Sequence, residues 1–208
     1  MPDRKKYQTI LLFGAPGAGK GTQGQILAQI PGFHHISTGD MFRTLDLHSD
    51  LGKVFYEYSS KGELVPDEVT IKLWQQYAKA QAILGVFKPY EDLLVLDGVP
   101  RTKKQAELME EYIDVLEVVH LVCHDMDAMI KRLRRRALKQ NRADDAREDV
   151  IRNRFQVYLD ETRPVLEHYP AEIVQEVDAV GSPGAVLQHI LEVVVPVQEE
   201  HFANQLDQ

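Results

Sequence analysis

One glycine-rich stretch, Gly14-Ala15-Pro16-Gly17-Ala18-Gly19-Lys20-Gly21-Thr22, constrains the fold of this chain more than any other feature. It follows an apolar run at residues 9–13 and precedes a helical pattern at residues 23–30. A strand, a glycine loop and a helix in this order predict a phosphate-binding loop. Glycines let backbone N–H groups approach phosphate oxygens, the helix N-terminus adds a partial positive charge, and Lys20 adds a full one. The alternative reading is a glycine turn that merely joins a strand to a helix.

The composition bounds the class of protein. The chain has 208 residues, of which 44% are hydrophobic and 27% charged, as expected for one soluble α/β domain with a sizeable core. Its one cysteine excludes an internal disulfide and a multi-cysteine zinc site, so we expect a cytoplasmic protein without zinc. No apolar run approaches the length of a membrane span, and we expect no membrane association.

The net charge of −8 is unevenly distributed. Residues 131–154 alone carry a net charge of +6, which leaves −14 for the rest of the chain. A mostly negative surface repels a polyanion, so we expect no binding to nucleic acid. One dense basic segment is better suited to a small, highly charged anion.

Strands alternate with helical patterns along the chain, which predicts a parallel sheet with helices on both faces. The expected strands are residues 9–13, 33–36, 93–97, 118–122 and 173–177. We also expect one long helix over residues 150–168, a cap at Asp67 for the helix that follows it, and a last helix that begins at Ser182-Pro183 and ends at Pro196.

Two short motifs have both structural and functional readings. Ser37, Thr38 and Asp40 could each cap the helix that begins near Met41. Cys123-His124-Asp125 could be imagined as a nucleophile beside a base, but adjacent residues rarely point at one another. We therefore interpret the second motif as a strand end followed by a helix cap.

From Ile10 to about Ile190 the chain resembles the adenylate kinases, a branch of the nucleoside monophosphate kinases. The glycine loop resembles that family's own variant, which has Gly21 after Lys20. Four further motifs carry the resemblance: Ile36-Ser37-Thr38-Gly39-Asp40-Met41-Phe42-Arg43, Gly62-Glu63-Leu64-Val65-Pro66-Asp67-Glu68, Leu96-Asp97-Gly98-Val99-Pro100-Arg101-Thr102 with Gln105, and Arg142-Ala143-Asp144-Asp145 with Arg154, Tyr158 and Thr162.

The resemblance implies a P-loop NTPase-like five-stranded parallel sheet and the reaction Mg·ATP + AMP ⇌ 2 ADP. The substrates would be ATP and AMP, and the cofactor Mg²⁺. The acceptor is already an anionic phosphate, so catalysis needs positioning and charge neutralisation rather than a general base. Arginine suits this task because its planar fork grips phosphate bidentately.

The site residues follow from the resemblance, motif by motif. The residues implied in catalysis are Lys20, Arg43, Arg101, Arg136, Arg142 and Arg154. Those implied in ATP binding are Gly17, Ala18, Gly19, Lys20, Gly21, Thr22, Arg136 and Gly181. Those implied in AMP binding are Thr38, Gly39, Arg43, Glu63, Leu64, Val65, Gly98, Val99, Pro100, Arg101, Gln105, Arg142 and Arg154. Asp97, and Asp40 through water, would place the magnesium ion.

Thr38 and Gln105 favour AMP, because relatives that act on UMP or CMP tend to have Ala and Asn there. The chain also departs from the family pattern. Val99 replaces the usual Phe, Asn141 replaces the usual Gly before Arg142, and one extra residue before Arg154 leaves Arg152 as a possible substitute. Residues 80–92 are longer than typical.

We expect a single kinase domain over residues 1–208, acting as a monomer. Its core would comprise residues 9–36, 67–135 and 148–195, with an AMP-binding arm at 37–66, a short lid at 136–147 and a mobile tail at 196–208. Two alternatives remain open at this point: a UMP/CMP kinase with the same machinery, or a nucleotide-binding regulator that has lost catalysis.

Overall fold

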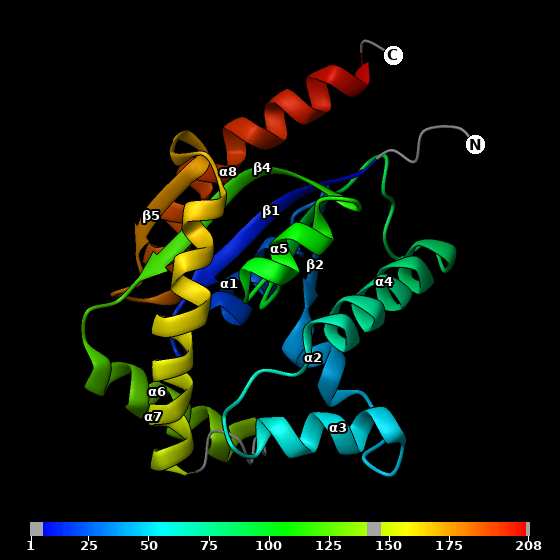
Figure 1. The fold of residues 1–208 in the computed structure, drawn as a ribbon. Helices are drawn as coiled ribbons and strands as arrows, with labels where there is room; N and C mark the ends of the chain where they lie inside the picture. The colour runs from blue at the N-terminus through cyan, green and yellow to red at the C-terminus, as the bar shows by residue number, and fades with distance from the viewer. Residues whose placement is uncertain (1–5, 141–146, 207–208) are drawn as a thin grey trace.

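The computed structural model describes residues 6–140 and 147–206, and its centre is one parallel five-stranded sheet (Figure 1). The strands are β1 (Tyr7–Gly14), β2 (Phe33–Ser37), β3 (Leu93–Asp97), β4 (Ile113–Val122) and β5 (Val174–Asp178). Their order is β2-β3-β1-β4-β5. The chain therefore builds one side of the sheet from β2 and β3 and the other from β4 and β5. Ligands bind at such a reversal, beyond the carboxyl ends of the strands.

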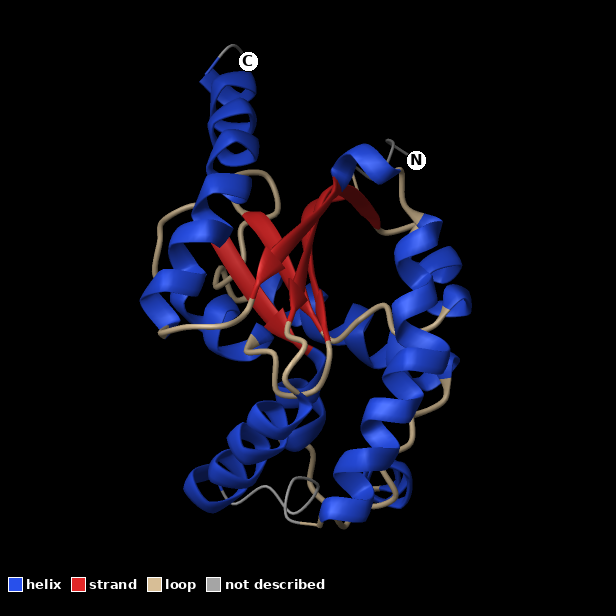
Figure 2. Ribbon diagram, turned by 90° about the vertical axis from the view of Figure 1, so that its left-hand side faces the viewer, coloured by secondary structure: helices blue, strands red, loops and turns tan. Residues whose placement is uncertain are grey.

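Both faces of the sheet are covered, as the apolar runs of the sequence predict (Figure 2). Side chains alternate between the faces, so that Leu11 and Phe13 pack in one core cluster while Ile10 and Leu12 pack in the other. The first cluster is closed by α2 (Thr38–Arg43), α4 (Asp67–Ile83) and α5 (Lys103–Met109). The second is closed by α1 (Lys20–Leu27) and α8 (Pro183–Leu206).

The remaining helices extend beyond the carboxyl edge of the sheet. α3 (Asp50–Ser59) belongs to the segment between β2 and α4, and α6 (Met126–Gln140) and α7 (Glu148–Val157) lie on the other side of the same opening (Figure 1). Met129, Leu133, Ile151 and Phe155 are buried together and pack α6 against α7 in a third core cluster. The projection of α6 and α7 thus has an apolar core of its own, whereas Phe55 of α3 packs against the first cluster.

Three elements begin at least three residues earlier than the sequence predicts, and α2 is one of them, since it begins at Thr38 rather than near Met41. α1 begins at Lys20 rather than Gln23, because Gly19 adopts φ 104° and turns the loop directly into the helix. β4 begins at Ile113 rather than Val118, because its backbone pairs with β1 from that residue onward. Asp114 and Glu117 interrupt the apolar pattern of the sequence and hide this half of the strand. A register shift in this pairing accommodates the irregular half of the strand.

The helix expected over residues 150–168 is present as three consecutive segments. α7 is followed by a π-helical turn (Tyr158–Thr162) and then by a 3₁₀ segment (Arg163–His168). Pro164 has no backbone N–H, so an α-helical bond to Asp160 is impossible and the chain changes its hydrogen-bond register there. The change of register brings Tyr158 and Thr162 to the inner side of the segment, where both are buried.

The expected helix end at Pro196 is wrong. α8 continues through Pro196 to Leu206. Gln198 Nε2 donates to the Pro31 carbonyl at 2.9 Å, and the ring of His201, only 7% exposed, contacts Gln8 Oε1 and the Glu91 carbonyl. These contacts hold the last turns on the amino-terminal edge of the sheet, and they offset the helix bond that proline removes.

Candidate functional site

Three contiguous cavities lie along the carboxyl edge of the sheet. The arm cavity lies under α2 and α3 and includes Thr38, Leu64, Gln105 and Tyr158 in its lining. The loop cavity is bordered by Lys20, Gly21, Asp97 and other residues of the glycine loop. The outer cavity lies between that loop, α6 and the start of α8. The loop cavity shares lining residues with both of the others, so the three lie next to one another with the loop cavity in the middle.

The glycine loop has the geometry of an anion site. Gly14, Gly17 and Gly19 adopt φ values of 146°, 86° and 104°, which only glycine adopts without strain. The close packing is equally strict, because a Cβ on Gly14 would lie 2.7 Å from the Leu121 carbonyl oxygen and one on Gly17 2.9 Å from that of Met129. The loop therefore encloses a space in front of α1 that backbone N–H groups can line.

Lys20 is held inside this loop. Its Nζ donates to the Gly14 carbonyl at 2.6 Å and to the Ala15 carbonyl at 3.3 Å. Burial lowers the pKa of the Lys20 ammonium from 10.5 to about 8. Asp97 opposes this shift, whereas Arg101, Arg136 and Arg154 add to it. A cluster of like charges around a buried lysine is unfavourable until an anion enters.

The loop cavity is lined by an excess of positive charge. Its basic lining residues are Lys20, Arg43, Arg101, Arg136 and Arg154. Its carboxylates are those of Asp40 and Asp97, and Asp40 Oδ1 accepts from Arg43 at 2.6 Å. Asp97 faces the loop, because a Cβ on Gly21 would lie 3.4 Å from Asp97 Oδ2. Five cations against two carboxylates in a small cavity attract a polyphosphate.

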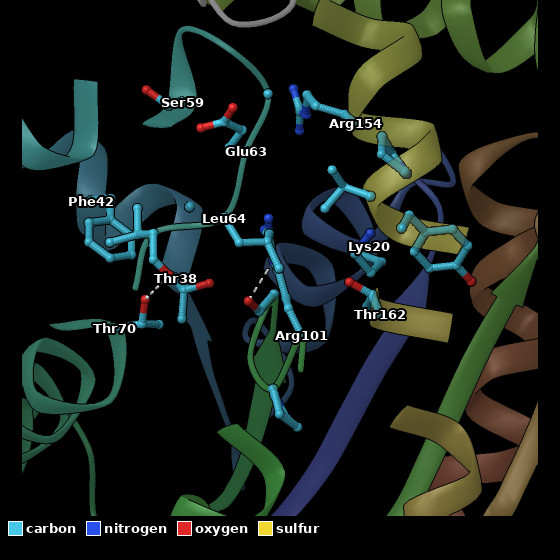
Figure 3. Close-up of a pocket in the computed structure, with 18 of the residues that line it drawn as sticks. Lys20, Thr38, Phe42, Ser59, Glu63, Leu64, Thr70, Arg101, Arg154 and Thr162 are labelled. Atoms are coloured by element: carbon cyan, nitrogen blue, oxygen red, sulfur yellow. Dashed lines mark hydrogen bonds between the residues drawn. The ribbon is translucent and has the colours of Figure 1, made fainter. Parts of the chain in front are cut away.

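The arm cavity combines apolar walls with a charged inner end. Figure 3 shows Thr38, Phe42, Leu64 and Thr70 on one side and Lys20, Arg154 and Thr162 on the other, with Arg101 between them. Phe42 stacks on Phe55 with ring centroids 5.2 Å apart and an interplanar angle of 6°. Flat aromatic and aliphatic walls next to several cations suit a planar base that carries a phosphate.

A tight turn at Gly98 joins the two cavities. Gly98 adopts φ 85°, and a Cβ there would lie 2.7 Å from Thr38 Oγ1 and 2.9 Å from the Arg101 guanidinium. Thr38 Oγ1 donates to the Asp97 carbonyl at 3.3 Å, and Arg101 Nε donates to the Gly98 carbonyl at 2.8 Å. The turn thereby fixes the Arg101 side chain at the boundary between the arm cavity and the loop cavity.

Around Gln105, the wall of the arm cavity contains a hydrogen-bond network that the sequence did not reveal. Gln105, 2% exposed, accepts at Oε1 from the Arg101 N–H at 2.8 Å and donates from Nε2 to Asp67 Oδ1 at 2.9 Å. Thr102 Oγ1 also donates to Asp67 Oδ1, at 3.0 Å. The expectation that Asp67 caps α4 is wrong: Pro66 is the N-cap, and the Asp67 carboxylate bonds to the start of α5 instead.

The sequence-based site residues line these three cavities with few exceptions. Thr38, Gly39, Glu63, Leu64, Val65, Gly98, Pro100 and Gln105 line the arm cavity. Gly17, Ala18, Gly19, Thr22, Arg136 and Gly181 line the outer cavity. Val99, 2% exposed, packs in the core cluster behind the arm cavity instead of lining it. Arg142, together with the expected lid residues 141–146, lies outside the described residues.

The structure also shows where the alternative residues within single motifs lie. Ser37 is the cap of α2, because its Oγ accepts from the Asp40 N–H. Asp125 Oδ1 accepts from the Ala128 N–H at 2.8 Å, which confirms the cap reading of the segment after Cys123. Arg154 lines both the arm and the loop cavities, whereas Arg152 donates to Glu148 Oε1 at 2.8 Å on the surface.

Several lining residues were not assigned to the site from the sequence. Phe42, Phe55, Ser59 and Thr70 lie in the arm cavity, and only their positions on α2, α3 and α4 place them there. Tyr158, which also lines the arm cavity, is held from behind by His120, whose Nε2 lies 2.9 Å from the Tyr158 hydroxyl. Burial lowers the pKa of His120, although Glu176 opposes this shift. The contact joins β4 to the π-helical turn, and although Tyr158 belongs to a motif that carries the resemblance, nothing in the sequence indicates His120 as its partner.

Within residues 6–140 and 147–206, no three His, Cys, Asp or Glu side chains are grouped so that they could hold a metal ion. Over the same part of the chain, none of the helices combines the length and the apolar character that a membrane span requires.

Comparisons with known proteins agree on one family. A family model described as adenylate kinase matches residues 12–174. An adenylate kinase of Mycobacteroides abscessus is 39% identical over 175 residues, which cover 83% of this chain and 91% of the relative. Adenylate kinases of Kocuria rhizophila and Flavobacterium psychrophilum are 38% and 34% identical, covering 88% and 89% of this chain and 96% and 97% of those relatives.

Proposed function

This chain belongs to the adenylate kinase family, and we propose that it catalyses the reversible reaction Mg·ATP + AMP ⇌ 2 ADP. One AMP phosphate oxygen attacks the γ-phosphorus of ATP, and the bond from that phosphorus to the β–γ bridging oxygen breaks. The bridging oxygen stays with the first ADP, and the transferred phosphoryl group completes the second.

The single observation that carries this proposal is the order of the three cavities. A cavity lined by aromatic and aliphatic side chains adjoins a cation-lined centre, which adjoins in turn a further cavity at the far side of the glycine loop. Two nucleosides at the ends with their phosphates meeting in the middle fit this arrangement. In-line phosphoryl transfer requires such an end-to-end approach.

On the ATP side, the glycine loop and Lys20 are proposed to hold the β- and γ-phosphates, with Gly17, Ala18, Gly19, Gly21 and Thr22 contributing backbone and hydroxyl groups. Arg136 is proposed to neutralise charge on the transferring group. Gly181 lines the outer cavity at φ 127°, where its backbone can approach the adenine closely.

On the AMP side, Arg43 and Arg101 are proposed to clamp the phosphate bidentately. Arg154, with Arg142 from the segment outside the described residues, would cover the group in transit. The remaining proposed AMP contacts are Thr38, Gly39, Glu63, Leu64, Val65, Gly98, Val99, Pro100 and Gln105. Val99 would act from behind the pocket wall, since it does not line the cavity.

Magnesium is proposed to accompany ATP. Two carboxylates, Asp97 and Asp40, line the loop cavity, and so small a set suits an ion that keeps most of its own waters. When bound, the ion would neutralise the phosphate oxygens and keep them aligned. Asp97 would orient it, and Asp40 would act through water. No zinc is proposed.

The domain organisation is proposed as a core with two moving parts. Residues 37–66 would form an arm that closes over AMP, and residues 136–147 a short lid that closes over the phosphates. Closure would exclude water, which could otherwise take the phosphoryl group in place of AMP. We propose a cytoplasmic monomer that requires neither nucleic acid nor membrane.

A coupled assay of ADP formation tests the function. The enzyme receives Mg·ATP with AMP, UMP, CMP, GMP or dAMP in separate reactions, and Lys20→Ala serves as the inactive reference. We expect a strong preference for AMP that Lys20→Ala abolishes. A preference for UMP or CMP would contradict the assignment of the acceptor while leaving the phosphoryl-transfer site intact. No turnover with any acceptor, despite ATP binding, would indicate a nucleotide-binding regulator.

A further inference from the structure

The orientation of the Gln105 amide is determined by two partners whose polarity is unambiguous. The Arg101 backbone N–H can only donate, so the amide atom 2.8 Å away must be the oxygen. A carboxylate can only accept, so the amide atom 2.9 Å from Asp67 Oδ1 must be the nitrogen. Reversing the amide would place a donor against a donor and an acceptor against a carboxylate.

This network leaves two hydrogen-bonding groups of the amide for a ligand. Each terminal amide has two N–H donors and two lone pairs on its oxygen. Among the described residues, Asp67 takes one of these donors and Arg101 one of the lone pairs. Gln105 is buried but lines the arm cavity, so the second N–H and the second lone pair are its means of reading a base.

We propose that Asp67 is a specificity-determining residue: by fixing the Gln105 amide it selects an acceptor with an amino group at purine position 6 over one with an oxo group. Adenine presents an N–H donor beside a ring acceptor, which complements a fixed lone pair and N–H. A 6-oxo purine presents an acceptor where adenine has its donor, so two oxygens would face each other. This inference rests on the proposed function, because it names the residue that sets base choice in the same site.

Asp67 is a positioning residue under this proposal and does not touch the substrate. It lies in the first turn of α4 and reaches across to the N-terminus of α5. Asp67→Asn keeps the size of the side chain, but its amide can either donate or accept. In this variant only the Arg101 N–H still opposes a reversed Gln105 amide, whereas in the wild type Asp67 opposes it as well. The discrimination between a 6-amino and a 6-oxo purine therefore weakens.

The test compares kcat/KM for AMP and for inosine monophosphate, whose base has an oxo group at position 6 and a proton on the neighbouring N1 where adenine has an amino group and an acceptor. We expect Asp67→Asn to lower the AMP-to-IMP ratio about tenfold, as for loss of one charge-assisted hydrogen-bond constraint. The matched control is Glu68→Gln, which removes the same charge from the same helical turn at an exposed position, and it should leave the ratio unchanged. The KM for ATP should change in neither variant.

A double-mutant cycle tests whether Asp67 acts through Gln105. In a Gln105→Leu background, Asp67→Asn should no longer change the ratio. The proposal is overturned if Asp67→Asn lowers kcat/KM for both acceptors by the same factor, or if it changes the ratio equally with and without Gln105. If Asp67→Asn does not fold, Asp67→Ser makes the same comparison, because a hydroxyl also donates or accepts. Failure of the wild-type enzyme to use AMP would instead refute the proposed function itself.

Discussion

Raising the pH from 7 to 9 is expected to weaken ATP binding, because it deprotonates the Lys20 ammonium. Its ammonium is buried in the glycine loop among three arginines, which lowers its pKa to about 8. The charged fraction therefore falls from about nine-tenths at pH 7 to about one-tenth at pH 9. Since the free enzyme must present a cation to the phosphates, kcat/KM for Mg·ATP should fall about tenfold over this range.

Proton uptake gives a second, independent measure of the same effect. Bound phosphates favour the charged lysine and raise its pKa again, so nucleotide binding should take up about half a proton at pH 8 and more at pH 9. Calorimetric titrations in buffers of different ionisation enthalpy measure this number. Saturating ATP should also flatten the pH profile of kcat, because the lysine is already charged in the complex.

Lys20→Arg is the matched control, because a guanidinium stays charged throughout this range. Its activity is expected to be lower, since the planar group fits the loop less well, but its kcat/KM for ATP should not decline between pH 7 and 9. A flat wild-type profile, or a parallel decline in wild type and Lys20→Arg, would refute the assignment of the titration to Lys20.

Three further results are expected. Gly98→Ala should raise the KM for AMP at least about tenfold with little effect on the KM for ATP, because φ 85° and the 2.7 Å approach to Thr38 Oγ1 leave no room for a methyl group; initial rates at varied AMP and varied ATP measure both. The free energy of unfolding should fall as pH drops below about 6.5, because burial lowers the pKa of His34, His35 and His120 and the unfolded chain therefore protonates these histidines first. Denaturant unfolding at pH 7 and 5.5 tests this, and His120→Leu should reduce the difference in unfolding free energy between the two pH values. Truncation after Pro196 should cost about 2–3 kcal/mol of stability through the lost contacts of Gln198 and His201, and an unchanged melting temperature would contradict the docking of the last turns.

The fold class could be predicted from the sequence because its signals are local. The run at residues 93–97 is buried at every position, as a strand covered on both faces must be. The glycine loop and the Ser182-Pro183 helix start likewise depend on the chemistry of a few neighbouring residues. Family membership could also be predicted, since the motifs that carry the resemblance lie in order along the chain.

Local signals failed where distant contacts outweigh them. A proline such as Pro196 normally ends a helix. Here Gln198 and His201 bond to partners that precede them in the chain by 167 and 193 positions, and these contacts keep α8 intact. Asp114 and Glu117 obscured half of β4, although β1 pairs along its whole length. The change to a π-helical turn at Tyr158 depends on Pro164 together with the packing of Tyr158 against His120.

The sequence by itself determined the chemistry of this protein: a glycine loop with Lys20, the arginines that neutralise phosphate, and the carboxylates beside them. Only the tertiary structure decided how these groups act together. It brought β1, α2 and the turn at Gly98 to one edge, it lowered the pKa of Lys20 by burying it among like charges, and it set the Gln105 amide between Arg101 and Asp67. Residue types are chosen one position at a time, whereas burial and the direction of a hydrogen bond depend on segments that meet only when the chain folds.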